Sequence, residues 1–168
     1  WPTFRAGGVD NLWQDAGHIH GVWRHASLAS FRTAEPAWET LIDLDALSKA
    51  EGKHWIWKGA TCLKPAEIRC LVRLSDGGGD SVELREFDTA RKAFVDGGLR
   101  FSNQKQYAEW LDHDTLLMGR DWKEGKDGGE LTDSGYPYVL KIVKRGQPVD
   151  QAHEVFRGEK ADVWAQPR

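Results

Sequence analysis

The chain has 168 residues and a formal net charge of −3 at pH 7, with 40% hydrophobic and 29% charged residues. This length suits one domain with a sizeable hydrophobic core. The slightly negative charge argues against a general nucleic-acid binder, which would carry a basic face. No apolar run approaches the roughly 18 residues that a membrane-spanning helix needs. We therefore expect neither a nucleic-acid nor a membrane partner.

The N-terminal residues Trp1 to Arg5 contain no charged segment followed by an apolar one, so they do not have the pattern of a signal peptide. The chain also begins without Met. We expect either a processed protein or a piece of a longer chain. The compartment stays open, although the lack of a signal peptide favours the cytoplasm.

Alternation of apolar and polar residues with a period of two predicts a series of short β-strands. Residues 1–10 are predicted to be irregular, and 11–15 form a short apolar-polar piece. The predicted strands, in chain order, are His20–Ser27, Leu28–Thr33, Trp38–Leu44, Trp55–Leu63, Cys70–Leu74, Val82–Phe87, Ala93–Val95, Tyr107–Leu111, Thr115–Arg120, Tyr138–Lys144, Ala152–Arg157 and a start at Val163–Ala165.

The clearest unit in this series runs from Arg69 to Val95. Its first two strands are separated by Gly77–Gly79, and glycine tolerates the positive φ of a tight turn. A short third strand follows, so the unit is predicted to be an antiparallel meander.

One helix is predicted, near 46–51, as a connector between strands. Asp45 is expected to cap its N-terminus, and Gly52 suits the position just after its C-terminus.

Three groups of residues each end a set of strands in a similar way, and they fall about 50 to 60 residues apart. These groups are Thr40–Leu44, Lys92–Val95 and Glu154–Phe156. Repeats of this length with three or four antiparallel strands are typical of β-propeller blades. We expect blade-like units at about 11–45, 54–96 and 106–157, with a further blade starting at 162–168. A β-sandwich with long loops would give a similar list of strands.

The two cysteines do not form a disulfide framework of the kind found in small secreted domains. If the hairpin between them turns near Ala66, Cys62 and Cys70 could lie opposite one another. Free cysteine commonly behaves as a small buried hydrophobe, so we expect two reduced thiols.

No motif for nucleophilic serine chemistry is present. The sequence has no Gly-x-Ser-x-Gly, and the nearest motif, at Ser134, lacks the first glycine and follows a loop rather than a strand. We predict no catalytic residue and no cofactor-binding residue in this chain.

Metal binding is not predicted either. His18, His20 and His25 lie close together in the sequence, but structural zinc sites usually need four Cys or His ligands. The segment Asp76–Asp80 lacks the alternating oxygen donors and closing Glu of a calcium loop, so a plain hairpin turn is favoured. It is not a phosphate-binding loop, because no Gly-Lys-Ser/Thr follows.

The nine tryptophans allow two interpretations. Trp13, Trp23, Trp38, Trp55, Trp57 and Trp110 could form a carbohydrate-binding platform. Aromatic residues more often serve core packing, however, and Trp38 and Trp57 lie within apolar strands, which favours the core.

Ten short motifs follow one another along nearly the whole chain. They are Leu12–Asp15, Gly21–Arg24, Glu35–Glu39, Leu44–Leu47, Ala50–Lys53, Trp55–Ala60, Leu74–Gly78, Phe94–Gly98, Leu116–Gly119 and Leu131–Pro137. Taken in this order, they resemble the opening of the propeller domain in serine peptidases of the prolyl oligopeptidase family.

The resemblance implies an all-β fold, a partial propeller with about three blades of four-stranded antiparallel sheets. In that family a seven-bladed propeller covers an α/β-hydrolase domain that carries a Ser-Asp-His triad. The propeller admits short peptides, which are cleaved after proline, and keeps folded proteins out. This chain would be roughly the first half of the propeller. No triad residue can be carried over, because no position matches those motifs.

The resemblance also implies the partners: the missing hydrolase domain, the remaining blades and the short peptide substrates of the parent chain. Alone, the chain is expected to be inactive. Because an incomplete ring exposes blade faces and sheet edges, we also expect self-association. The alternatives are a stand-alone β-sandwich that binds glycans through its tryptophans, and a small propeller-like interaction protein.

Overall fold

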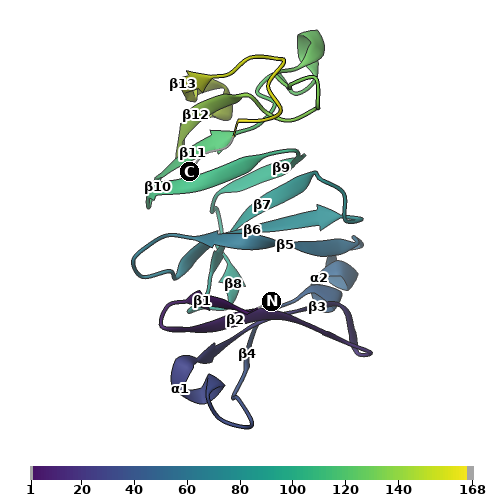
Figure 1. Ribbon diagram of the computed structural model, residues 1–168, viewed down its shortest axis with the longest axis vertical. Coiled ribbons are helices and arrows are strands. Elements are labelled where there is room, and N and C mark those ends of the chain that lie inside the picture. The colour runs from purple at the N-terminus through teal and green to yellow at the C-terminus, as the bar shows by residue number, and fades with distance from the viewer. Residues whose placement is uncertain (1, 166–168) are drawn as a thin grey trace. The chain divides into compact units, whose positions relative to one another are not determined.

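The computed structural model describes residues 2–165, which form three antiparallel sheets (Figure 1). The chain divides into two compact units, Trp1–Gly79 with Glu83–Phe101 and Asp80–Val82 with Ser102–Arg168. Within residues 2–165, no helix is long and apolar enough to cross a membrane. The predicted all-β architecture is confirmed.

The first sheet has four strands in the order β1-β2-β3-β4. They are Thr3–Arg5 (β1), Gly8–Asp15 (β2), His18–Ser27 (β3) and Glu39–Asp43 (β4). The prediction that residues 1–10 are irregular was wrong. The reason is the turn at 6–7, which lets three residues on its N-terminal side pair with the beginning of β2, with Arg5 opposite Gly8.

A short helix, Leu28–Phe31 (α1), occupies residues that were predicted as part of a strand. The preceding Ser27 explains the difference, because its hydroxyl accepts a hydrogen bond from the backbone N–H of Ser30 at 3.2 Å. Serine at this position satisfies a backbone donor that the first helical turn leaves unpaired. The local capping interaction therefore outweighs the alternation of apolar and polar residues.

The predicted connector helix is Leu44–Glu51 (α2), and Gly52 ends it with φ +62°. The capping residue was assigned wrongly. Asp43, not Asp45, accepts the backbone N–H of Ala46 at 2.9 Å, because Asp43 is the last residue with an extended backbone. Asp45 lies in the first turn, and its carboxylate bonds to β3 instead.

The second sheet has five strands. Trp55–Cys62 (β5), Arg69–Asp76 (β6), Val82–Asp88 (β7) and Ala93–Phe94 (β8) follow one another, and Arg100–Gln104 (β9) also pairs with β7. The strand β9 was not predicted, because its sequence is mainly polar. The turn between β6 and β7 contains Gly77 and Gly78 at φ +82° and +86°, which confirms the hairpin expected there.

The first two sheets share one hydrophobic core within the first unit. Trp23, Leu41, Ile42 and Leu44 come from the first sheet and α2, and Trp55, Cys70, Val72, Leu74 and Phe87 come from the second sheet. Close packing of these side chains fixes the two sheets against each other.

The third sheet belongs to the second unit and has the order β10-β11-β12-β13. Its strands are Tyr107–Asp112 (β10), Thr115–Gly119 (β11), Val139–Lys144 (β12) and His153–Arg157 (β13). Two single-turn 3₁₀ helices, Lys126–Gly128 and Val149–Gln151, lie in the connections. The strand expected to start at Val163 is not formed over residues 163–165, and 166–168 lie outside the described residues.

Candidate functional site

A pocket of about 470 Å³ lies in the first unit, lined by strands of the first and second sheets. The apolar residues among its lining include Leu12, Trp23 and Trp57. The ring centroids of Trp23 and Trp57 are 4.8 Å apart, with their planes tilted by 33°. Trp23 is buried, whereas Phe4 is 81% exposed.

Arg5 fixes one side of this pocket. Its Nη2 donates to Asp10 at 3.1 Å, and its Nη1 donates to the carbonyl of Glu67 at 2.9 Å and to Thr89 Oγ1 at 3.3 Å. His25 Nδ1 lies 2.6 Å from Asp10 Oδ1, the same oxygen that accepts from Arg5 Nη2. Glu67 and Thr89 flank strands of the second sheet. The Arg5 guanidinium therefore connects β1 both to β2 of the first sheet and to the second sheet.

Arg73 is a second cation in the lining of this pocket, and its position depends on a glycine. Its Nε donates to the carbonyl of Lys58 at 3.1 Å, and its Nη1 donates to Thr61 Oγ1 at 2.8 Å. A Cβ placed on Gly59 would lie 2.6 Å from Arg73 Nη2, and Gly59 has φ +107°. Only glycine suits both the backbone conformation and the close approach of the guanidinium.

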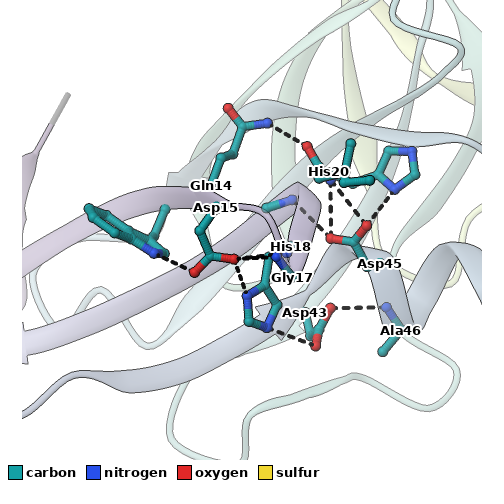
Figure 2. A network of polar contacts seen from close by, with 11 residues as sticks. Gln14, Asp15, Gly17, His18, His20, Asp43, Asp45 and Ala46 are labelled. Carbon is teal, nitrogen blue, oxygen red and sulfur yellow. Dashed lines mark hydrogen bonds and ion pairs between the residues drawn. The ribbon is translucent and has the colours of Figure 1, made fainter.

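The histidines form pairs with carboxylates at the β2–β3 hairpin (Figure 2). His18 Nδ1 lies 2.9 Å from Asp15 Oδ1, and the Trp13 indole donates to Asp15 Oδ2 at 2.9 Å. The hydrogen bonds from Trp13 and His18 lower the pKa of Asp15 from 3.8 to about 2. The hairpin turn is thus closed around an ionised carboxylate.

A second carboxylate joins the same hairpin to α2. Asp45 accepts the backbone N–H groups of His20 at 3.1 Å and Gly21 at 3.2 Å, and its Oδ1 lies 2.9 Å from His20 Nδ1 (Figure 2). Burial raises the pKa of Asp45, but these hydrogen bonds outweigh it and leave the pKa below its ordinary value. Within residues 2–165, no three His, Cys, Asp or Glu side chains are grouped so as to hold a metal ion.

Cys62 and Cys70 form a disulfide, so the prediction of two reduced thiols was wrong. The two residues are direct partners in the β5–β6 ladder, with their Cα atoms 3.9 Å apart. Residues facing each other at such close positions of an antiparallel pair bring their side chains together. The hairpin turning near Ala66 indicated this arrangement, but spacing alone did not decide between bonded and free thiols.

Ser134, Asp76 and Asp80, which the sequence analysis tested as candidate site residues, make local hydrogen bonds or lie in a turn. Ser134 is exposed in a turn closed by the hydrogen bond from Gly135 N to the carbonyl of Thr132 at 2.8 Å. Asp76 accepts the Lys53 ammonium at 2.9 Å. Asp80 accepts the Tyr136 hydroxyl at 3.1 Å. Both carboxylates therefore already have hydrogen-bond partners.

The tryptophans that the structure describes do not form one exposed platform. Trp23 and Trp55 are buried in the core, and Trp57 packs against it as expected. Trp38 is only half-buried and lies outside the buried cluster, where the Arg24 guanidinium stacks between it, at 4.2 Å, and Trp13, at 4.4 Å.

Sequence reasoning missed Arg5 and Asp10, because residues 1–10 were expected to be irregular. The signal that could have found them is the turn at Gly7, which separates two short segments able to pair.

Comparison with known proteins identifies one family that matches nearly the whole chain. The family described as the prolyl oligopeptidase N-terminal beta-propeller domain matches residues 1–166. The chain is similar to an uncharacterized peptidase of Sinorhizobium fredii, with 49% identity over 166 residues that cover 98% of this chain and 22% of that protein. An uncharacterized peptidase of Rickettsia prowazekii is 33% identical over 94% of this chain and 22% of its own length. The chain thus spans about a fifth of these relatives.

Solved structures of peptidases show the same similarity. A post-proline cleaving enzyme from Rickettsia typhi matches 98% of this chain and 24% of its own, with a TM-score of 0.87 and 31% identity. Oligopeptidase B from Leishmania major matches 94% of this chain and 20% of its own, with a TM-score of 0.68 and 11% identity, which shows the fold alone. The expected partial propeller is confirmed, and the β-sandwich alternative is wrong.

Proposed function

Because this chain belongs to the prolyl oligopeptidase family, as part of its N-terminal β-propeller domain, we propose that it gates the active site of a serine peptidase that cleaves short peptides after proline. The observation that supports this most is the continuous match over residues 1–166, together with the structural likeness to a post-proline cleaving enzyme. The chain supplies part of the gate. The hydrolase domain and the remaining blades supply the chemistry and complete the ring.

The gating role follows from how a propeller is built. Its blades are arranged around a central channel, so the side chains at one edge of each sheet set the width and character of that channel. In each of the three sheets here, the earliest strand in the chain (β1, β5 or β10) lies at one edge and the last strand of the main path at the other. In this proposal each sheet is one blade, and the three blades have the approximate limits 11–45, 54–96 and 106–157. The first blade also includes β1, and the second also includes β9.

A proline-containing peptide tests this function in the full-length natural protein. The peptide is offered either free in solution or as part of a stably folded protein. We expect cleavage after proline in the free peptide and none in the folded protein, because a propeller channel admits only chains that can thread through it. Equal rates on both substrates would contradict gating, and the absence of cleavage of the free peptide would contradict the peptidase assignment.

A further inference from the structure

We propose that the Cys62–Cys70 disulfide is a reversible thiol–disulfide pair, which a small thiol of the glutathione type opens at Cys62, and that its state controls how firmly β1 is held against the second sheet. The switch does not require the proposed peptidase activity. Three features of the molecule support it: the unequal access to the two sulfurs, an acceptor for the buried thiol, and the contacts of the hairpin between the cysteines.

The two sulfurs differ in their access to solvent. Cys70 is 0% exposed and belongs to the core, whereas Cys62 is partly buried and lines the pocket of about 470 Å³ in the first unit. Small-molecule sites usually have volumes of roughly 300–1,000 Å³. Because thiol–disulfide exchange depends on access to the attacked sulfur, a small thiol in this pocket reacts at Cys62.

The exchange balances in two steps. The small thiolate attacks Cys62 Sγ, the Cys62–Cys70 bond breaks, and Cys70 leaves as a thiolate that takes up the proton lost by the small thiol. A second small thiolate then attacks the small-molecule sulfur of this mixed disulfide, and Cys62 leaves. Two small thiols are oxidised to one small disulfide, and the protein disulfide is reduced to two thiols. An excess of the small disulfide drives the same steps in reverse.

The buried thiol has an acceptor in place. Cys70 Sγ lies 3.9 Å from the carbonyl oxygen of Glu67. In the disulfide this sulfur carries no proton, but the reduced thiol is a weak donor that this carbonyl accepts. Reduced cysteine otherwise packs as a small hydrophobe, so the core around Cys70 accommodates either form.

The hairpin between the cysteines holds the end of β1. The carbonyl of Glu67 accepts from Arg5 Nη1 at 2.9 Å, and its carboxylate accepts from the backbone N–H of Ala6. The backbone of Glu67 has φ +52°, a conformation that a residue with a side chain keeps only where its surroundings fix it. The disulfide joins the two ends of the segment 63–69 and so restricts the conformations of this segment.

Reduction therefore affects β1. Without the covalent link the segment 63–69 has more conformational freedom, and movement of Glu67 releases its hydrogen bonds to Arg5 and Ala6. Because β1 has 3 residues, these two bonds are a large share of its contacts with the second sheet. The pairing of Arg5 with Gly8 in β2 is independent of the disulfide, so we expect local loosening and not unfolding of the unit.

The modification site is tested on the full-length natural protein, folded, with oxidised glutathione as the probe. In Cys70→Ala we expect one glutathione on Cys62, located by peptide mass mapping. In the matched variant Cys62→Ala the buried Cys70 should stay unmodified. A thermal melt of each variant shows whether it is folded. An unmodified Cys62 in folded Cys70→Ala, or equal modification of Cys70 in folded Cys62→Ala, would overturn the proposal.

The effect on β1 is measured on the wild-type full-length protein, which needs no substitution. Hydrogen exchange followed by mass spectrometry compares the oxidised protein with protein reduced by millimolar glutathione in the absence of denaturant. We expect the bond to open in the folded protein and exchange in 3–8 and 63–69 to become about tenfold faster, because local opening becomes easier. The segment 139–144 in β12 belongs to the second unit and should not change. A bond that glutathione opens only in denaturant, or equal exchange of 3–8 in both states, would contradict the switch.

Discussion

Arg85 and Glu51 form a bidentate ion pair, with Nη1 to Oε1 and Nη2 to Oε2 distances of 2.7 Å each. The pair joins the middle of β7 to the end of α2. Arg85 is buried, its Nε donates to Glu83 at 2.6 Å, and the Trp55 indole donates to Glu51 at 2.9 Å. The hydrogen bonds from Arg85 hold the pKa of Glu51 below its ordinary value. A strand whose residues are all buried can carry charged side chains only because they are paired in this way.

Replacing Glu51 by Gln should lower the free energy of unfolding by about 2 kcal/mol, because a buried guanidinium loses a charged partner while the shape of the side chain is kept. The control is Glu154→Gln, which weakens the exposed pair with Arg157 and should cost about 0.5 kcal/mol or less. Both are measured by denaturant unfolding. Equal losses in the two variants would contradict the prediction that the buried pair contributes more to the free energy of unfolding than the exposed pair.

The Cys62–Cys70 disulfide should protect both sulfurs from alkylation. Denatured protein treated with iodoacetamide is expected to gain no label without reductant and two labels after reduction, as measured by intact mass. Reduction should also lower the stability of the unit by about 2–3 kcal/mol, because the bond closes a short loop in the unfolded chain. Two labels without reductant, in protein purified under non-reducing conditions, would contradict the bond.

The stability should depend on pH in the acid range through Asp15. Its pKa is about 2 in the folded chain against an ordinary 3.8, so the unfolded state binds this proton more readily. The contribution is therefore fully present above pH 3.8 and is lost as the pH falls to about 2. Asp15→Asn should flatten the unfolding curve against pH in this window. Asp133→Asn, at a carboxylate 3.8 Å from Lys160 on the surface, serves as the control. An unchanged slope in Asp15→Asn would contradict the role of Asp15.

The isolated chain should self-associate through the second unit. Phe156 and Val155 on β13 are 51% and 47% exposed, and Trp164 is 50% exposed. Such apolar surface, when it is not covered, drives association. Light scattering at increasing concentration should show a rising mean mass, and Phe156→Ser should reduce the rise. A constant monomer mass at high concentration would contradict this prediction.

The sequence predicted β7 and β12 from the alternation of their residues, because successive side chains of a strand point to opposite faces and this leaves a direct trace in the residue order. It did not predict β1 or β9. Both are short or polar, and they pair because a neighbouring strand offers an edge. Likewise, the choice between Asp43 and Asp45 as the cap of α2 depends on the point where the extended backbone ends, which the residue types do not reveal.

The candidate pocket could not be predicted from the sequence for a related reason. Phe4 and Trp57 lie on strands of different sheets, yet residues of both strands line one pocket. The motifs in the sequence indicated the family, but the site depends on contacts between segments far apart in the chain.

The most direct test of the central claim is to treat the native source with a tagged fluorophosphonate and to measure the mass of the polypeptide that contains this sequence. Because the chain covers 22% of its curated relatives, we expect one labelled polypeptide several times heavier than 19.0 kDa. An unlabelled polypeptide of about 19.0 kDa would contradict the account and favour a separate binding module.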